Sequence, residues 1–470
     1  MKVRINYHMF AVLALLVLVT ASPGFGSQPE ELPRGKVIES VACKADPQQS
    51  YALYLPSRYT ADKKWPMLYA FDPAARGKLP VTLFKDAAEK FGYIVVGSNN
   101  SQNGMQVAGI VKTLWADTHA RFKIDDQRVY TTGFSGGARV ALAVALGYSG
   151  QVAGVIACSA GFPASAAPAP GLAFVVFATT GTEDFNFPEV QQLKRKLEAL
   201  GVRNHLEVFA GGHDWPPADL CAQAIRWMEI QGMKKGTRVK DDALIDQLLT
   251  ERTTKTRGYE TAGKNYEAYL EYQALAADFA DLRDTREFEA NTARLAAIKE
   301  IKAAIKSERG QEERQRDLEF KVQTLLAKLQ PGASYPETLA ELKSVFLDLT
   351  RKAEDTRDIS QQRVSCRVLH ATFALLYESA DRLSMSKNNS GAAEKLEIAA
   401  LIKPKNPYLF YELAIAYARA GNKSKAINAL GRAIESGFTD SARIEQDQEF
   451  DPLRNEAGYK KLVSGIKKTM

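Results

Sequence analysis

The pattern of apolar and polar residues changes part-way along the chain. From Gly35 to about Met233, short continuous apolar runs alternate with amphipathic segments. Such runs are typical of strands buried on both faces, and the segments between them are typical of helices. Strands are predicted at 36–42, 50–55, 65–71, 93–97, 128–134, 152–158, 173–178 and 206–209, and helices at 83–91, 106–121, 138–146 and 188–200. We therefore expect an α/β fold over 35–233, with a mainly parallel sheet covered on both faces.

Beyond 234–242 the strand-like runs stop, and Ala, Glu, Lys, Leu and Arg dominate. Apolar residues recur at helical spacing over 258–282 and 285–306, which predicts a helical region over 239–365. The strongly charged stretch 308–316 is expected to be a solvated turn of helix. Pro331-Gly332 and Pro336 are expected to break the helices.

The last hundred residues contain a repeat. Its apolar positions in the first copy recur 34 positions later, and the matching sets are Ala392, Leu396, Ala399 and Ala426, Leu430, Ala433. This period and the positions of Phe410, Leu413, Ala414 and Tyr417 resemble the tetratricopeptide repeat. The resemblance implies paired antiparallel helices over 366–470, completed by earlier helices, and a surface for docking a protein or peptide partner.

The N-terminus has the pattern of a signal peptide over 1–26. Lys2 and Arg4 precede the apolar run Met9–Ala21, and small residues follow at Gly24 and Gly26. The alternative is an uncleaved anchor, but the run is shorter than the ~20 residues that a spanning helix needs. The sequence therefore predicts an exported protein, periplasmic or secreted, without a stable membrane span.

Net charge and cysteine spacing say little about which partners or metals the chain binds. The formal net charge is +7, or +5 without Lys2 and Arg4, and no basic cluster is interleaved with aromatic residues, so no nucleic-acid partner is expected. The spacing of the four cysteines matches no metal motif and leaves three full disulfide pairings open. Cys158 lies in a predicted apolar strand and is expected to be a buried small hydrophobe.

A G-x-S-x-G pattern, Gly133 to Gly137, centres on Ser135. It follows the predicted strand 128–134 and opens the predicted helix 138–146, which is the context of a nucleophile elbow. The alternative is a strand-to-helix turn with a passive serine. The surroundings must decide between them, because a serine nucleophile needs a base and the base needs a group to orient it.

The base and its orienting acid are expected after later strands, in the order serine, acid, histidine. Only His213 follows directly after the last predicted strand; the others are His8, His119, His205 and His370. Asp184 follows the strand before it and is preferred as the acid, with Glu183 as the alternative. Asp214 is too close to the histidine in sequence to orient it.

Together these segments resemble the α/β-hydrolase fold, and more narrowly the secreted esterases that include polyhydroxybutyrate depolymerases and feruloyl esterases. "RVYTTGFSGG" and "GGHDWP" carry the likeness. The resemblance implies that Ser135 is the nucleophile, His213 the general base and then acid, and Asp184 its orienter. It also implies that the reaction needs no metal or organic cofactor.

The oxyanion hole is where this chain departs from such esterases, which usually carry His-Gly after the strand that ends near residue 71. Here the loop reads "FDPAARG". The Gly136 N–H can serve as one donor. Pro73 has no N–H, so Ala74 is the expected second donor, with Asp72 as the alternative. Arg76 is expected to be a plain surface residue, and the alternative is that it offsets negative charge at this loop.

An open cleft is expected, because 161–170 is too short for a large lid. Phe162, Phe185 and Trp215 are candidates to bind substrate, and a place in the core is the alternative for each. The sequence thus favours an exported serine esterase acting on small or polymeric esters. The alternatives are a serine peptidase and a non-catalytic scaffold with a degenerate hydrolase domain.

Overall fold

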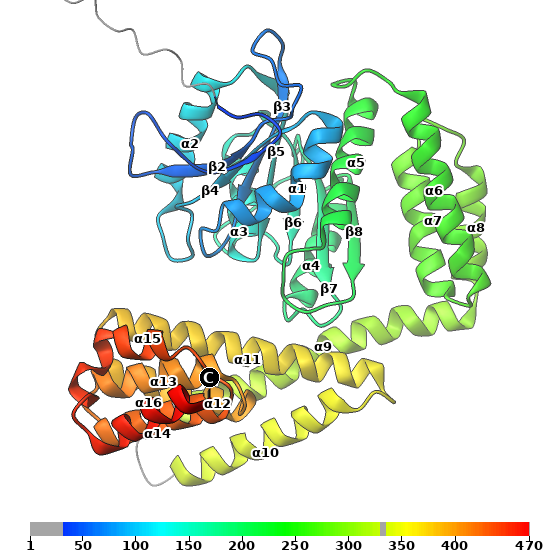
Figure 1. Cartoon of the computed structure of the whole chain (residues 1–470). Coiled ribbons are helices and arrows are strands. Elements are labelled where there is room, and N and C mark those ends of the chain that lie inside the picture. The colour runs from blue at the N-terminus through cyan, green and yellow to red at the C-terminus, as the bar shows by residue number, and fades with distance from the viewer. Residues whose placement is uncertain (1–31, 330–334, 470) are drawn as a thin grey trace, which may run out of the picture. The chain divides into compact units, whose positions relative to one another are not determined.

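The computed structural model describes residues 32–329 and 335–469, and its first half is built on an eight-stranded sheet (Figure 1). The order is β1-β2-β4-β3-β5-β6-β7-β8. The strands are β1 (Val37–Ala42), β2 (Ser50–Tyr54), β3 (Trp65–Phe71), β4 (Ile94–Ser98), β5 (Ile124–Phe134), β6 (Val152–Cys158), β7 (Val175–Gly181) and β8 (Asn204–Phe209). Pairing is antiparallel between β1 and β2 and between β2 and β4, and parallel from β4 to β8. The predicted α/β fold with a mainly parallel sheet is confirmed.

Helices cover both faces of this sheet (Figure 1). They are α1 (Lys78–Phe91), α2 (Val107–Arg121), α3 (Gly136–Gly147), α4 (Phe187–Ala199) and α5 (Ala218–Lys235). The helices α1 and α5 pack on each other and share one apolar core with the sheet. On the other face α2 contacts α3 through Trp115 and Tyr148, and α3 contacts α4 through Arg139 and Glu189.

The largest differences from the sequence prediction are at two helices. Helix α5 was not predicted, because nearly all of its second half is buried and the apolar-polar period is therefore weak. Helix α1 begins at Lys78, five residues before the predicted start, since Pro80 fits the first turn of a helix. Among the strands, β5 begins four residues earlier than predicted and β7 ends three residues later, at Gly181. The candidate residues Ser135, Asp184 and His213 still follow the carboxyl ends of β5, β7 and β8.

The second half of the chain is helical. Its helices are α6 (Asp242–Thr261), α7 (Asn265–Phe279), α8 (Arg286–Ala296), α9 (Lys299–Lys328), α10 (Tyr335–Glu354), α11 (Ile359–Met385), α12 (Asn389–Ile402), α13 (Pro407–Arg419), α14 (Lys423–Glu435), α15 (Ser441–Gln446) and α16 (Ala457–Thr469), with the 3-10 helix η1 (Gln448–Leu453). An apolar core joins α5 to α6 and α7. A second core unites α9 to α16, and the repeat positions named above are all buried. The boundary expected at 365/366 falls inside the continuous helix α11.

The charged stretch 308–316 is helical, as expected, but it is only partly solvated. It lies within α9, where Glu312 and Gln315 are buried. Arg195 of α4 donates to both carboxylate oxygens of Glu312, at 2.9 and 2.8 Å. Two acidic residues of this stretch thus meet partners on α4, since Gln191 also donates to Glu308 at 3.0 Å. Composition alone does not reveal these contacts.

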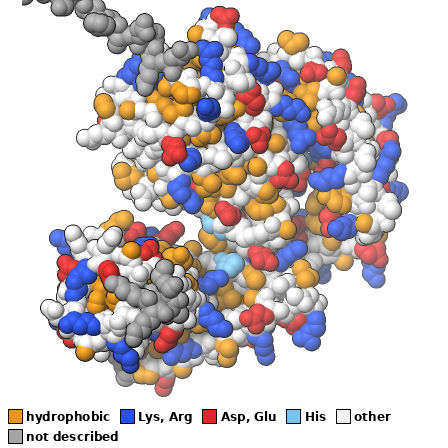
Figure 2. Space-filling view, in the orientation of Figure 1, with side chains coloured by type: hydrophobic (Ala, Val, Ile, Leu, Met, Phe, Trp, Pro, Cys, Tyr) orange, Lys and Arg blue, Asp and Glu red, His pale blue; other side chains and the backbone are white. Residues whose placement is uncertain are grey.

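The remaining predictions concern the N-terminus, the helix-breaking prolines, the cysteines and a membrane span, and some of them lie outside the described residues. The signal peptide 1–26 and Pro331-Gly332 are outside them, while Pro336 opens α10 as a helix-starting proline. None of the four cysteines is paired, and Cys158 is buried. Among the described residues no helix is long and apolar enough to cross a membrane. On the face that Figure 2 shows, basic and acidic side chains are intermingled.

Candidate active site

Ser135 lies in a strained turn between β5 and α3. Its φ of 52° and ψ of −118° are rare for a residue with a side chain and cost on the order of 1–3 kcal/mol. The turn is held by a hydrogen bond from the Ser135 N–H to the Cys158 carbonyl oxygen, at 2.8 Å. A Cβ atom at Gly137 would collide with the Phe71 carbonyl, and one at Gly133 with the Gly137 carbonyl. The glycines of the pattern therefore let β3, β5 and α3 approach closely enough to present Ser135.

His213 joins Ser135 to a buried carboxylate. Its Nε2 lies 2.9 Å from the Ser135 Oγ, and its Nδ1 lies 2.7 Å from the Asp184 Oδ1. Asp184 is fully buried and also accepts the Asn186 N–H at 2.8 Å and the Thr180 hydroxyl at 3.2 Å. An ionised Asp184 accepts the Nδ1 proton of a neutral imidazole, which leaves Nε2 free to accept the proton of Ser135.

The alternative acids do not contact His213. Asp214 accepts the N–H of its own neighbour Trp215, and Glu183 lies one residue before Asp184, with its N–H bonded to the Gly211 carbonyl. The three residues that the sequence suggested for the triad, Ser135, Asp184 and His213, therefore come together although 78 residues separate the first from the last.

Two phenylalanine rings flank the imidazole. The ring centroid of Phe185 lies 4.0 Å from that of His213, and the centroid of Phe134 lies 4.6 Å away. Phe185 and Phe162 are half-buried, and Phe162 lies under the Lys196 ammonium group. Both rings thus keep some accessible surface near this edge of the sheet.

Trp215 does not line an open cleft. Only 6% of it is exposed, and its Nε1–H donates to the Asp72 Oδ2 at 2.8 Å. Its ring packs against Phe134. The prediction that Trp215 is a substrate-binding residue is therefore corrected: it ties the loop that carries His213 to the loop after β3.

The carboxylate of Asp72 is fully buried and fully paired. It accepts the Arg76 Nε and Nη2 protons, each at 2.9 Å, besides the Trp215 indole and the Ala74 N–H at 2.9 Å. Although burial by itself would raise the pKa of Asp72, hydrogen bonds from Arg76 and Trp215 lower it below its ordinary value. Arg76 is therefore the partner of this buried charge and not a plain surface residue.

The two expected oxyanion donors differ in their bonding. The Gly136 N–H belongs to the first turn of α3, which offers it no acceptor within the helix. The Ala74 N–H is already bonded to Asp72. Ala74 can act as a second donor only if that bond opens, which the sequence did not suggest.

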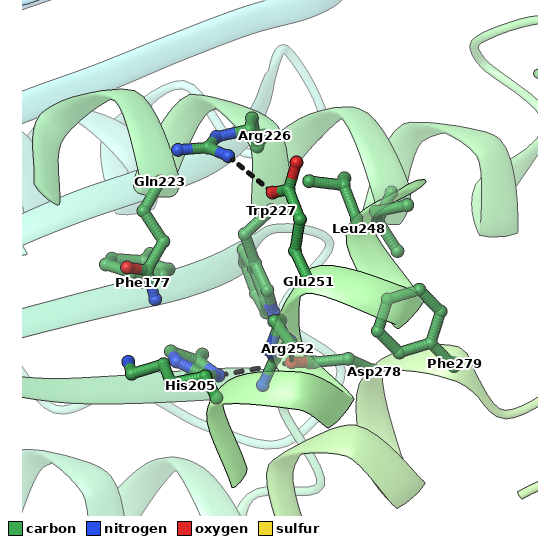
Figure 3. A pocket seen from close by; sticks show the side chains of 12 residues that line it. Phe177, His205, Gln223, Arg226, Trp227, Leu248, Glu251, Arg252, Asp278 and Phe279 are labelled. Atoms are coloured by element: carbon green, nitrogen blue, oxygen red, sulfur yellow. Dashed lines mark hydrogen bonds and ion pairs between the residues drawn. The ribbon is translucent and has the colours of Figure 1, made fainter. Parts of the chain in front are cut away.

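A second histidine, His205, belongs to a separate polar cluster between β8 and the helices α6 and α7 (Figure 3). Its Nδ1 lies 3.2 Å from the Asp278 Oδ2, and its Nε2 lies 3.2 Å from the Glu207 Oε1. Arg252 and the Trp227 indole also donate to Asp278. Burial alone would lower the pKa of His205, but these two carboxylates outweigh it and raise that pKa to about 9.

Comparison with known proteins finds one family for the α/β part. Residues 63–220 match the family described as phospholipase/carboxylesterase, which supports a carboxylesterase-like hydrolase. No curated protein matches the chain.

Three solved structures that are similar to this chain are described as hydrolases or esterases. S-formylglutathione hydrolase from Staphylococcus aureus is 17% identical, with 42% of this chain and 99% of that chain covered and a TM-score of 0.34. A ferulic acid esterase is 18% identical, with 41% and 97% covered and a TM-score of 0.34. The Bacillus cereus carboxylesterase is 17% identical, with 40% and 97% covered and a TM-score of 0.33. These similarities concern less than half of the chain, so the roles of individual residues follow from the site itself.

Proposed function

We propose that the chain is a serine hydrolase of carboxylic esters that works through an acyl-enzyme on Ser135. The observation that carries the proposal is the continuous hydrogen-bonded line from the strained Ser135 through His213 to the buried Asp184. A serine held in this geometry has a base for its proton, and the base has a fixed tautomer. The family match of residues 63–220 supports an ester as substrate.

The proposed reaction has two halves. The Ser135 Oγ attacks the ester carbonyl carbon while His213 Nε2 takes the hydroxyl proton, and the Gly136 N–H stabilises the oxyanion. The C–O bond to the alcohol then breaks, and His213 returns the proton to the leaving alcohol. In the second half His213 takes a proton from water, whose oxygen attacks the acyl group. The carboxylic acid leaves as Ser135 regains its proton.

Labelling with a fluorophosphonate, together with hydrolysis of a short acyl nitrophenyl ester, tests this proposal. Wild-type protein should be labelled and active, and Ser135→Ala should lose labelling and roughly 10⁶-fold in kcat. Ser149→Ala is the matched control, because Ser149 is an exposed serine just beyond the other end of α3. Folded wild-type protein that takes no label would contradict the proposal and favour a non-catalytic scaffold. Cleavage of peptides in preference to esters would favour a peptidase.

Export also belongs to the proposal, and the basic and apolar pattern of 1–26 supports it. Cell fractionation and the mass of the mature chain test it. A mature chain that begins near residue 27 in the periplasm or medium is expected, and an intact chain in the cytoplasm would overturn it.

The helical repeat is the proposed docking surface for a protein or peptide partner. The 34-residue period supports a tetratricopeptide-like role. Capture of a partner by the full-length chain should be lost when surface residues of α12 to α14 are exchanged. Capture that survives all such exchanges would place the partner elsewhere.

A further inference from the structure

Arg367 of α11 is a buried cation. It is 1% exposed, and among the described residues no carboxylate forms an ion pair with it. Burial lowers the pKa of its guanidinium to about 10. Keeping a charged group in such a place costs stability unless hydrogen bonds or nearby charges compensate for the lost hydration.

The guanidinium is directed at the loop that carries Asp184. Its Nε and Nη2 both donate to the Thr182 carbonyl oxygen, at 2.9 and 2.5 Å. Its carbon atom Cζ lies 3.7 Å from the ring centroid of Phe187. Thr182 and Phe187 bound the segment 182–187, so Arg367 contacts both of its ends. The positive charge of Arg367 also attracts the negative charge of Asp184.

A second helix bonds the middle of the same segment. Gln315 of α9 is 1% exposed, and its Nε2 donates to the Phe185 carbonyl oxygen at 2.8 Å. The ring of Phe185 in turn packs on His213. The backbone on both sides of Asp184 is therefore held by side chains that the α/β part does not supply.

We propose that Arg367 and Gln315 are positioning residues that hold Asp184 in line with His213, so that α9 and α11 are functional parts of the active site. The inference rests on the proposed function and extends it. Residues 182–186, between the end of β7 and the start of α4 at Phe187, form no strand or helix of their own. A displacement of about 1 Å in a catalytic array can reduce the rate about 10²-fold. Clamping both sides of the acid limits that displacement.

The test exchanges Arg367 for methionine in the full-length protein. Arg367→Met should lower kcat for a nitrophenyl ester about 10²-fold and leave KM nearly unchanged, because a side chain that is 1% exposed offers the substrate almost no surface. Arg367→Lys, which keeps the cation but has a single donor nitrogen, should recover part of the loss. Arg195→Met is the matched control: it removes the bidentate Arg195–Glu312 pair between α4 and α9 without touching 182–187. Its kcat should match wild type.

A measurement that does not depend on turnover separates this inference from the proposed function. A proton held in the 2.7 Å contact between His213 Nδ1 and Asp184 should give a far-downfield proton NMR resonance in the wild type. We expect this resonance to broaden or vanish in Arg367→Met and to persist in Arg195→Met. If wild type shows no turnover, the proposed function fails while the resonance still tests the clamp.

A folded Arg367→Met protein that keeps both the resonance and the wild-type kcat would overturn the inference. Equal losses of kcat in Arg367→Met and Arg195→Met would also overturn it. If Arg367→Met does not fold, Gln315→Met provides the same test. Losing its one hydrogen bond to Phe185 should lower kcat about tenfold, and an unchanged kcat would overturn the inference.

Discussion

Within residues 32–329 and 335–469, two histidines pair with a buried aspartate, and their surroundings make the two pairs opposite in chemistry. In His213–Asp184 the second ring nitrogen faces the neutral hydroxyl of Ser135 at 2.9 Å. In His205–Asp278 it faces a second carboxylate, Glu207, at 3.2 Å. A neutral imidazole satisfies the first arrangement, whereas only an imidazolium can donate to both partners in the second.

The difference shows that a histidine held by an aspartate can act as a base only when the ring nitrogen that does not contact the aspartate faces a group that can lose a proton. His213 is 17% exposed at its side chain and His205 only 4%. The His205 cluster has no hydroxyl in that position and holds the α/β part against α6 and α7 (Figure 3). Changes to the first pair should therefore alter rate, and changes to the second should alter stability.

Among the changes that test this comparison, the largest effect is expected from Asp184→Asn. An amide at this position can donate to Nδ1, which moves the imidazole proton to Nε2 and removes the acceptor for Ser135. We expect kcat to fall about 10⁴-fold without a loss of fold. Steady-state kinetics measures this, with Asp214→Asn as the control, because Asp214 does not bond to His213. A variant that keeps a tenth of the activity would show that Asp184 does not orient the base.

Asp278→Asn should act on stability instead. The change removes the carboxylate that pairs His205 and Arg252, and leaves two buried cations short of a partner. Breaking a buried pair costs about 3–5 kcal/mol in the free energy of unfolding. Urea unfolding measures it, and kcat of the folded fraction should stay near wild type. A fall in kcat with an unchanged free energy of unfolding would show that the His205–Asp278 pair serves the reaction and not the stability of the fold.

Raising the pH should weaken the His205 cluster. The pKa of His205 is raised to about 9 in the fold, against an ordinary 6.5, so its contribution is complete below pH 6.5 and is lost as pH rises through 9. At 1.36 kcal/mol per unit the contribution reaches about 3 kcal/mol. The free energy of unfolding measured from pH 6 to 10 should show this loss in wild type and not in His205→Gln. Parallel profiles for the two proteins would contradict it.

The smallest effect is expected from Glu207→Gln, which leaves His205 with one carboxylate, as His213 has. Loss of the hydrogen bond between charged groups should cost about 1.5 kcal/mol. It should also move the pKa of His205 down from about 9, since Glu207 helps to raise it. NMR titration of the His205 ring measures the shift. An unmoved titration would mean that Asp278 alone holds the imidazolium.

The triad candidates were predictable because each depends on local sequence and on chain order. Ser135 lies between a recognisable strand and helix, and His213 and Asp184 follow the ends of later strands. The paired state of Asp72 was not predictable, since Trp215 reaches it across 143 residues. The place of Trp215 was left open for the same reason: an aromatic residue in a loop can face solvent or core, and only its neighbours decide.

The sequence by itself determined the strands, the elbow and the candidate triad, because periodicity, glycine and chain order act over short distances. Tertiary structure alone decided which charges are buried and which partner each one meets. The stretch 308–316 illustrates this, since its composition suggests solvent and its helix lies against α4. Arg367 illustrates it further: 185 residues separate it from Thr182, and no local pattern encodes a contact over that distance.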